Sequence, residues 1–113
     1  MKIDKELLKG STAMLILNLL ADQNMYGYQI TKELSNRSEK VFELKEGSLY
    51  PTLHSLEEKG MIESYWEESV STRKRKYYAI TKEGKKLLKE KQKEWEVYSS
   101  SINKVLGGVS YAY

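Results

Sequence analysis

The sequence predicts a mainly α-helical fold with one small β-hairpin and a long C-terminal helix. Apolar residues recur at helical spacing in three segments before residue 60. Two stretches rich in β-branched and aromatic residues, 61–66 and 75–80, then flank the polar segment 67–74, a pattern typical of a hairpin. After the hairpin, Leu88, Trp95 and Ile102 repeat every seven residues along an expected last helix, which ends before Gly107.

The composition indicates one globular domain that is not an enzyme. The chain has 113 residues, of which 40% are hydrophobic and 31% charged, and it has no cysteine. A single histidine, His54, cannot build a histidine-rich metal cluster, so we expect no metal and no cofactor. No nucleophile with a base and no phosphate-binding loop stands out. The apolar run 13–21 is too short to span a bilayer and lacks a cleavage signal, so we expect a cytoplasmic protein without a membrane partner.

The first expected helix covers about residues 4–22, and its second half is apolar on nearly every side. In so short a chain, this pattern suggests burial against a partner subunit. A second, short helix is expected at about 27–36, with Ile30 and Leu34 on one face. The segment 41–44 alternates weakly between apolar and polar residues and could be a short strand.

In the third expected helix, Leu49, Leu53 and Leu56 form a narrow inward-facing stripe. Proline lacks an amide hydrogen and is harmless in a first turn, so Pro51 predicts a helix start between 46 and 48. Ser48 is then a plausible N-cap, and Gly60 marks the end of the helix.

Helices followed by a hairpin and a long helix are the order of a winged helix-turn-helix, in which the third helix enters the major groove of DNA. On that helix Ser48, Tyr50 and His54 point away from the leucines and offer groups to phosphates or base edges. A polar, solvated face is the alternative. Tyr26 and Tyr28, at the start of the second helix, could either reach phosphates or pack in the core.

The net charge of +3 is unevenly distributed along the chain. Residues 1–70 carry 8 basic against 12 acidic side chains, whereas residues 71–113 carry 11 against 4. The hairpin holds four consecutive cations: Arg73, Lys74, Arg75 and Lys76. We expect these residues to contact phosphates or a narrow minor groove. Taken alone, the run could equally be the solvated tip of a surface hairpin.

The last helix carries an apolar stripe that needs a partner. We expect a homodimer interface built from this stripe and the first helix, comprising Leu15, Leu19, Leu88, Trp95, Tyr98, Ile102 and Val105. Trp95 could simply fill this interface. Alternatively, two Trp95 rings facing each other across a two-fold axis, with Leu15 beside them, could form a slot for a planar apolar compound.

The chain resembles the PadR family of bacterial transcription regulators, in particular its short branch with one C-terminal helix. The resemblance rests on the segments 8–11 (LKGS), 26–30 (YGYQI), 46–57 (EGSLYPTLHSLE), 60–62 (GMI) and 75–84 (RKYYAITKEG). It implies a homodimer in which the last helix packs against the partner's first helix. It also implies DNA contacts from Ser48, Tyr50, Pro51 and His54 and from the basic run 73–76. Family members with a tryptophan at this place in the last helix include multidrug-responsive repressors.

These observations predict a winged helix-turn-helix DNA-binding domain over residues 1–81, a dimerisation helix over 82–107 and a tail over 108–113. The expected function is repression of transcription by a homodimer that occupies a near-palindromic double-stranded DNA operator. A hydrophobic, flat aromatic effector at the dimer interface would relieve repression. The alternative is a winged-helix protein-interaction module that does not bind DNA.

Overall fold

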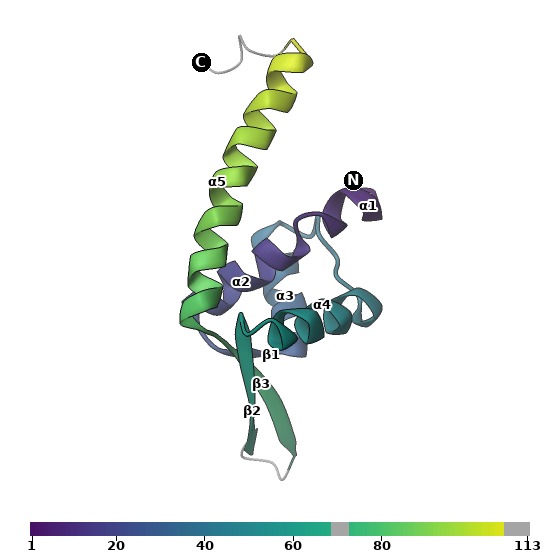
Figure 1. Cartoon of the computed structure of the whole chain (residues 1–113). Helices are drawn as coiled ribbons and strands as arrows, with labels where there is room; N and C mark the ends of the chain where they lie inside the picture. The colour runs from purple at the N-terminus through teal and green to yellow at the C-terminus, as the bar shows by residue number, and fades with distance from the viewer. Residues whose placement is uncertain (69–72, 108–113) are drawn as a thin grey trace.

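A computed structural model of the chain describes residues 1–68 and 73–107. The elements are α1 (Lys5–Lys9), α2 (Thr12–Asp22), β1 (Met25–Tyr26), α3 (Gly27–Arg37), α4 (Glu46–Glu58), β2 (Ile62–Glu68), β3 (Lys74–Ile80) and α5 (Lys82–Val105). Helices α2, α3 and α4 cluster together, the hairpin of β2 and β3 extends away from them, and α5 projects in the opposite direction (Figure 1). This confirms the predicted mainly helical winged-helix architecture. The expected tail, 108–113, lies outside the described residues.

The single N-terminal helix expected over 4–22 is wrong, because Gly10 and Ser11 divide it into α1 and α2. The hydroxyls of Ser11 and Thr12 donate hydrogen bonds of 3.1 and 2.9 Å to the Leu8 carbonyl. These hydroxyls therefore supply hydrogen-bond donors to a carbonyl near the C-terminal end of α1, where no further helical turn supplies them. As a result, α1 leaves the axis of α2 and forms one wall of a groove described below.

Helix α2 is buried largely within a single chain. Ile16, Leu17 and Leu20 belong to the core together with leucines of α3 and α4. Leu19 and Leu88, which we expected at the dimer interface, are only 2% and 7% exposed in one chain. A single chain therefore already buries most of these two side chains, because α2 packs directly against α5. Their place at the dimer interface stays a prediction.

The segment 41–44 is not a strand but part of the irregular connection between α3 and α4. Glu39 and Lys40 both adopt positive φ angles, 53° and 67°, and so reverse the chain after α3. The amide of Lys40 donates to the Ser35 carbonyl at 2.6 Å, which ties this turn to the end of the helix. Leu44 is buried beyond the turn and anchors the connection to the core.

Helix α4 begins where the sequence predicted but is capped differently. Its N-cap is Lys45, whose carbonyl accepts from the amides of Ser48 and Leu49 at 2.9 and 2.8 Å. Ser48 is therefore inside the helix and is not its cap. Pro51 lies in the second turn instead of the first, so the Gly47 carbonyl lacks the amide donor that residue 51 would normally supply.

The sheet has a third strand that the sequence pattern did not reveal. Its order is β1-β3-β2, and both pairings are antiparallel. In β1, Met25 pairs with Tyr78 and Tyr26 pairs with Tyr77. Strands β2 and β3 pair from Ile62 opposite Ile80 out to Glu68 opposite Lys74. We call the hairpin of β2 and β3 the wing (residues 62–80). Because β1 runs directly into α3, the pairing of β1 with β3 connects the wing to α3.

Thr81 joins the wing to α5. Its hydroxyl accepts from the Gly84 amide at 3.0 Å, as expected of an N-cap. The same hydroxyl can donate its hydrogen to the Gly60 carbonyl oxygen at 2.7 Å or to the Met61 carbonyl oxygen at 2.9 Å. Gly84 is buried against Met61 and Ile80. The start of α5 is therefore locked to the base of the hairpin.

This close approach predicts that Gly84→Ala destabilises the fold. A Cβ at residue 84 would overlap the Met61 carbonyl oxygen and lie 2.7 Å from Ile80 Cγ1. We expect the free energy of unfolding in urea, followed by circular dichroism, to fall by about 1–3 kcal/mol. Gly47→Ala is the matched control, because a Cβ at Gly47 meets no atom within 4 Å. Equal stability of the two variants would contradict the predicted clash.

Candidate nucleic-acid interface

The outer face of α4 is open to solvent. Leu49, Leu53 and Leu56 are buried as the sequence predicted, whereas Ser48, Pro51 and His54 are exposed on the other side. His54 Nε2 lies 3.7 Å from the Glu58 carboxylate on the next turn. This face offers a hydroxyl and an imidazole but no cation, so it is suited to contacts with base edges more than to binding phosphates.

Tyr50 has a different environment from the other three predicted α4 residues. It is 45% exposed, but the end of its ring lies against Gly27 at the start of α3. A Cβ at residue 27 would lie only 2.9 Å from Tyr50 Cζ. Tyr50 therefore spans the gap between α4 and α3, and only part of its ring faces solvent. The sequence pattern placed it on the outer face without showing this contact.

The basic run of the wing is divided between the two faces of the hairpin. Alternation along β3 places Arg75 on the face of Tyr77, and Lys74 and Lys76 on the face of buried Tyr78. Lys76 Nζ lies 5.8 Å from the centre of the Tyr78 ring. Arg73 is exposed just before β3 begins. The three cations of β3 are therefore divided between two faces and do not form one patch.

Two carboxylates of β2 lie opposite these cations. Glu67 is the cross-strand neighbour of Arg75, and Glu68 is that of Lys74. Directly opposed side chains in an antiparallel pair have Cβ atoms about 5 Å apart, close enough for their charges to interact. The wing is therefore less positive than its sequence suggests. The register that creates this opposition was not predicted.

A polar contact links α4 to the wing. The Ser64 hydroxyl donates a 2.5 Å hydrogen bond to the Glu57 carboxylate, which joins β2 to the last turns of α4. Burial raises the pKa of Tyr78, and the nearby Glu57 and Tyr50 raise it further. Together, Glu57, Ser64 and Tyr78 hold α4 and the hairpin in one arrangement.

The two tyrosines at the start of α3 have different surroundings. Tyr26 is half-buried, and its ring contacts Tyr77, with a centroid separation of 5.4 Å, and Arg75. Tyr28 is 64% exposed, and Lys32 Nζ lies 6.0 Å from the centre of its ring. Lys32, a cation one turn into α3, was not singled out by the sequence. Its pairing with Tyr28 adds a basic group beside the start of the helix.

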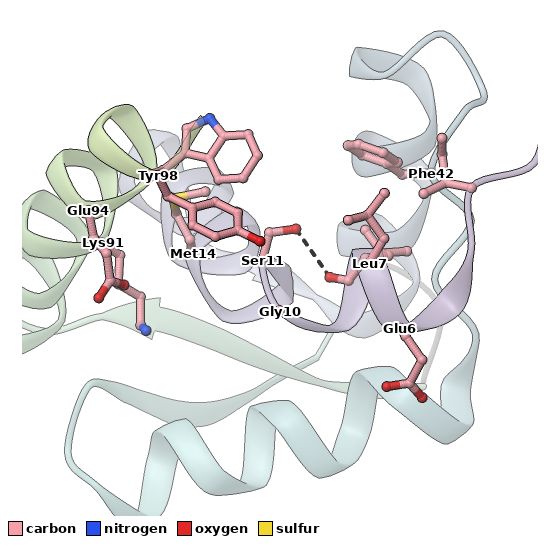
Figure 2. A pocket seen from close by; sticks show the side chains of 12 residues that line it. Glu6, Leu7, Gly10, Ser11, Met14, Phe42, Lys91, Glu94 and Tyr98 are labelled. Atoms are coloured by element: carbon pink, nitrogen blue, oxygen red, sulfur yellow. Dashed lines mark hydrogen bonds between the residues drawn. The ribbon is translucent and has the colours of Figure 1, made fainter. Parts of the chain in front are cut away.

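A separate groove of about 540 Å³ lies between the N-terminal segment and α5. In Figure 2, Tyr98 and Met14 lie on one side of it, and Leu7 and Phe42 on the other. Trp95 also lines this groove and is 47% exposed. Its ring centre is 6.0 Å from that of Tyr98. Leu15, the other residue expected to contact a ligand, does not line the groove.

Glu6 and Glu94 at this groove carry negative charge, and Lys91 carries positive charge. Beyond the groove, Ile102 and Val105 continue the apolar stripe of α5 from Tyr98, and all three residues are exposed in the single chain. Across residues 1–68 and 73–107, no cluster of three or more potential metal-ligating side chains occurs. Within the same residues, no helix is long and apolar enough to cross a membrane.

Comparisons with known proteins agree on one family. The model of the transcriptional regulator PadR-like family matches residues 16–90. A protein of Lysinibacillus sphaericus without an assigned function is 36% identical over 107 residues, which cover 95% of this chain and 98% of that protein. Transcriptional regulator Rv3488 of Mycobacterium tuberculosis is 34% identical over 107 residues, covering 95% and 94% of the two chains.

Solved structures show the same relationship. A transcriptional regulator from Clostridium thermocellum superposes with a TM-score of 0.83 and 38% identity, covering 88% of this chain and 97% of that one. A PadR family transcriptional regulator from Eggerthella lenta gives a TM-score of 0.79 and 34% identity over 89% and 86% of the two chains. The protein is therefore a member of the PadR-like family of transcriptional regulators, and it is not an enzyme.

Proposed function

We propose that the protein is a homodimeric repressor that binds a near-palindromic DNA operator. The observation that carries this proposal is the arrangement of α4 and the wing. Helix α4 exposes Ser48, Pro51 and His54, and the adjacent hairpin carries the basic run 73–76. In a winged helix, these two elements are the ones that meet the major groove and the flanking phosphates. A repressor of this kind acts where chromosomal DNA lies, so the proposal includes a cytoplasmic location.

We assign different roles in DNA binding to α4 and to the wing. No lysine or arginine occurs in α4 itself, and two of its acidic residues, Glu46 and Glu58, are exposed. Non-specific affinity for DNA comes mainly from cations that neutralise phosphates. We therefore assign most of the affinity to Arg73, Lys74, Arg75 and Lys76, and the discrimination between sequences to Ser48 and His54, with the exposed part of Tyr50 beside them.

Dimerisation follows from the unpartnered part of α5. Leu88 is buried in one chain, but Trp95, Tyr98, Ile102 and Val105 leave apolar surface exposed along the same helix. Removing such surface from water stabilises an association by about 25 cal/mol per Å². Two-fold symmetry then places two α4 helices on one duplex, so the preferred operator has matching half-sites.

Regulation is assigned to the region around Trp95. Trp95 and Tyr98, together with Met14 and Phe42, supply aromatic and apolar surface of the kind that binds a planar aromatic compound. We place this effector at the dimer interface. It relieves repression to the extent that it binds the conformation of low DNA affinity better than the DNA-bound one.

The assignment of affinity to the wing predicts a weaker salt dependence in the double variant Arg73→Ala/Arg75→Ala. Each lost phosphate contact lowers the slope of log K against log salt by about 0.9, so four contacts in a dimer correspond to a change of up to about 4. Binding is measured by fluorescence anisotropy with a labelled duplex. Lys85→Ala/Lys89→Ala removes the same charge from exposed positions on α5 and is the control. The same slope in both double variants would exclude the wing as the phosphate-binding element.

The proposed dimer predicts a sedimentation mass of about twice 13.2 kDa. Ile102→Glu/Val105→Glu places carboxylates on the apolar stripe and is expected to give a folded monomer, because burying unpaired charges is costly. Val97→Glu is the control, since Val97 is exposed but off the stripe. A monomeric wild-type protein, or a dimer that survives the Ile102 and Val105 substitutions unchanged, would refute this interface.

The proposed effector site predicts that a planar aromatic cation quenches tryptophan fluorescence. We expect micromolar affinity, corresponding to about −8 kcal/mol. Trp95→Ala should abolish most of the quenching, whereas Trp66→Phe should preserve it, because Trp66 lies in β2 of the wing. Sedimentation of Trp95→Ala verifies that the dimer persists. If quenching is lost in Trp66→Phe and persists in Trp95→Ala, the aromatic cation binds elsewhere.

A further inference from the structure

A continuous row of aromatic side chains connects the start of α3 to the wing. The Arg75 guanidinium carbon lies 4.6 Å from the centre of the Tyr26 ring. Tyr26 meets Tyr77 edge-on, with centroids 5.4 Å apart and ring planes at 70°. Tyr77 stacks on Tyr65 at 5.7 Å and 16°. The row ends at Asn24, whose side-chain amide donates to the Tyr65 hydroxyl at 2.9 Å.

The backbone around Tyr26 leaves its ring little freedom to move. Tyr26 pairs with Tyr77 in the sheet and is also the N-cap residue of α3. Its amide donates to the Gln29 side-chain oxygen at 3.1 Å. Pairing on one side and the first turn of a helix on the other therefore fix the Cα–Cβ direction. The ring of Tyr77 then limits the remaining rotation, so Tyr26 presents a fixed surface to Arg75.

The contact between Arg75 and Tyr26 differs from an ion pair in what it leaves exposed. Among the described residues, no carboxylate lies within 4.0 Å of the Arg75 guanidinium, although Glu67 is opposite it on β2. A carboxylate would occupy the N–H groups at the edge of the guanidinium. The Tyr26 ring face offers no such carboxylate oxygen, so the contact does not use the guanidinium N–H groups in an ion pair and leaves them for a bidentate phosphate contact.

We propose that Tyr26 is a positioning residue for DNA binding, which acts by holding the Arg75 guanidinium against its ring in the orientation that receives a DNA phosphate. This inference rests on the proposed DNA binding by the wing. The ring of Tyr26 performs this role, and its hydroxyl does not. Because Arg75 is ordered before DNA arrives, less side-chain freedom is lost on binding than for an unsupported arginine.

The first test examines the contact in the DNA-free protein. Arg75 is one of only three arginines, so its side-chain Nε–Hε signal in a ¹⁵N spectrum can be assigned with Arg75→Lys. A ring below the guanidinium shifts this proton by its ring current. Tyr26→Leu is expected to abolish the shift, and Tyr26→Phe to retain it. A signal with the same shift in wild type and Tyr26→Leu overturns the proposal.

The second test is a double-mutant cycle on DNA affinity, with the full-length protein and a labelled mixed-sequence duplex at low salt. Ordering a long side chain at an interface costs about 0.5–1.5 kcal/mol, so in Tyr26→Leu we expect a loss of affinity of roughly 2- to 12-fold for each Arg75 that contacts DNA. Tyr26→Phe should bind like wild type. In an Arg75→Ala background, Tyr26→Leu should have no further effect. In Arg75→Lys, which keeps the charge but lacks the planar group, it should also have little effect.

The outcomes separate this inference from the proposed function. A wild-type protein that binds no duplex overturns the proposed function and this inference with it. If the wild-type protein binds DNA, a second outcome overturns the inference alone. In that outcome Tyr26→Leu lowers DNA affinity equally in the wild-type and Arg75→Ala backgrounds, because Tyr26 then acts independently of Arg75. Circular dichroism confirms that each variant is folded, and Tyr26→Phe provides the folded conservative variant in which the ring is retained.

Discussion

The pairing of Met25 and Tyr26 with Tyr78 and Tyr77 is the constraint on which the arrangement of α4 and the wing depends. A two-stranded hairpin is only marginally stable in water and needs a third strand or a packed helix. Strand β1 supplies that third strand, and the side chain of Met25 is buried in the core beneath it. Because α3 begins at the next residue, one backbone segment places both the wing and the helical cluster. The angle between α4 and the wing follows from this pairing and from the Glu57–Ser64 contact.

Helix α5 has two roles along its length. Its first turns belong to the protomer core, since Gly84 lies against the backbone of Met61 and Leu88 is buried. Its later turns expose Trp95, Tyr98 and Ile102 and lack a covering element within the described residues. The helix therefore connects the base of the wing directly to the surface that we assign to dimerisation. Any change at that surface can reach the wing through one rigid element, which is the physical basis of the proposed regulation.

Local patterns predicted most of the fold, and contacts between distant residues account for the errors. The stripe of Leu49, Leu53 and Leu56 depends only on helical spacing, and all three are buried as expected. Strand β1 has two residues, too few for a period of two to be visible, and it forms because β3 lies beside it. The heptad pattern did not show that Leu88 is already buried within one chain, because that burial depends on long-range packing between α2 and α5.

In the candidate site, too, local patterns predicted some features, and contacts between distant residues determined the others. Exposure of Ser48, Pro51 and His54 followed from the position of the leucine stripe. The contact of Tyr50 with Gly27, and the opposition of Glu67 to Arg75, depend on the distance between helices and on strand register. The run 73–76 indicated a basic wing, but strand alternation divides it between two faces. A sequence pattern therefore identified which residues to consider and could not determine how the folded chain orients them.

The most direct test of the account is a map of amide chemical-shift changes on titration with a mixed-sequence duplex at low salt. If α4 and the wing form one DNA-facing surface, the changes will concentrate in the first turns of α4 and in residues 73–76, with the start of α3 beside them. The exposed stripe of α5, from Trp95 to Val105, will be largely unaffected. Changes concentrated on that stripe, with α4 and the wing unaltered, would contradict the account.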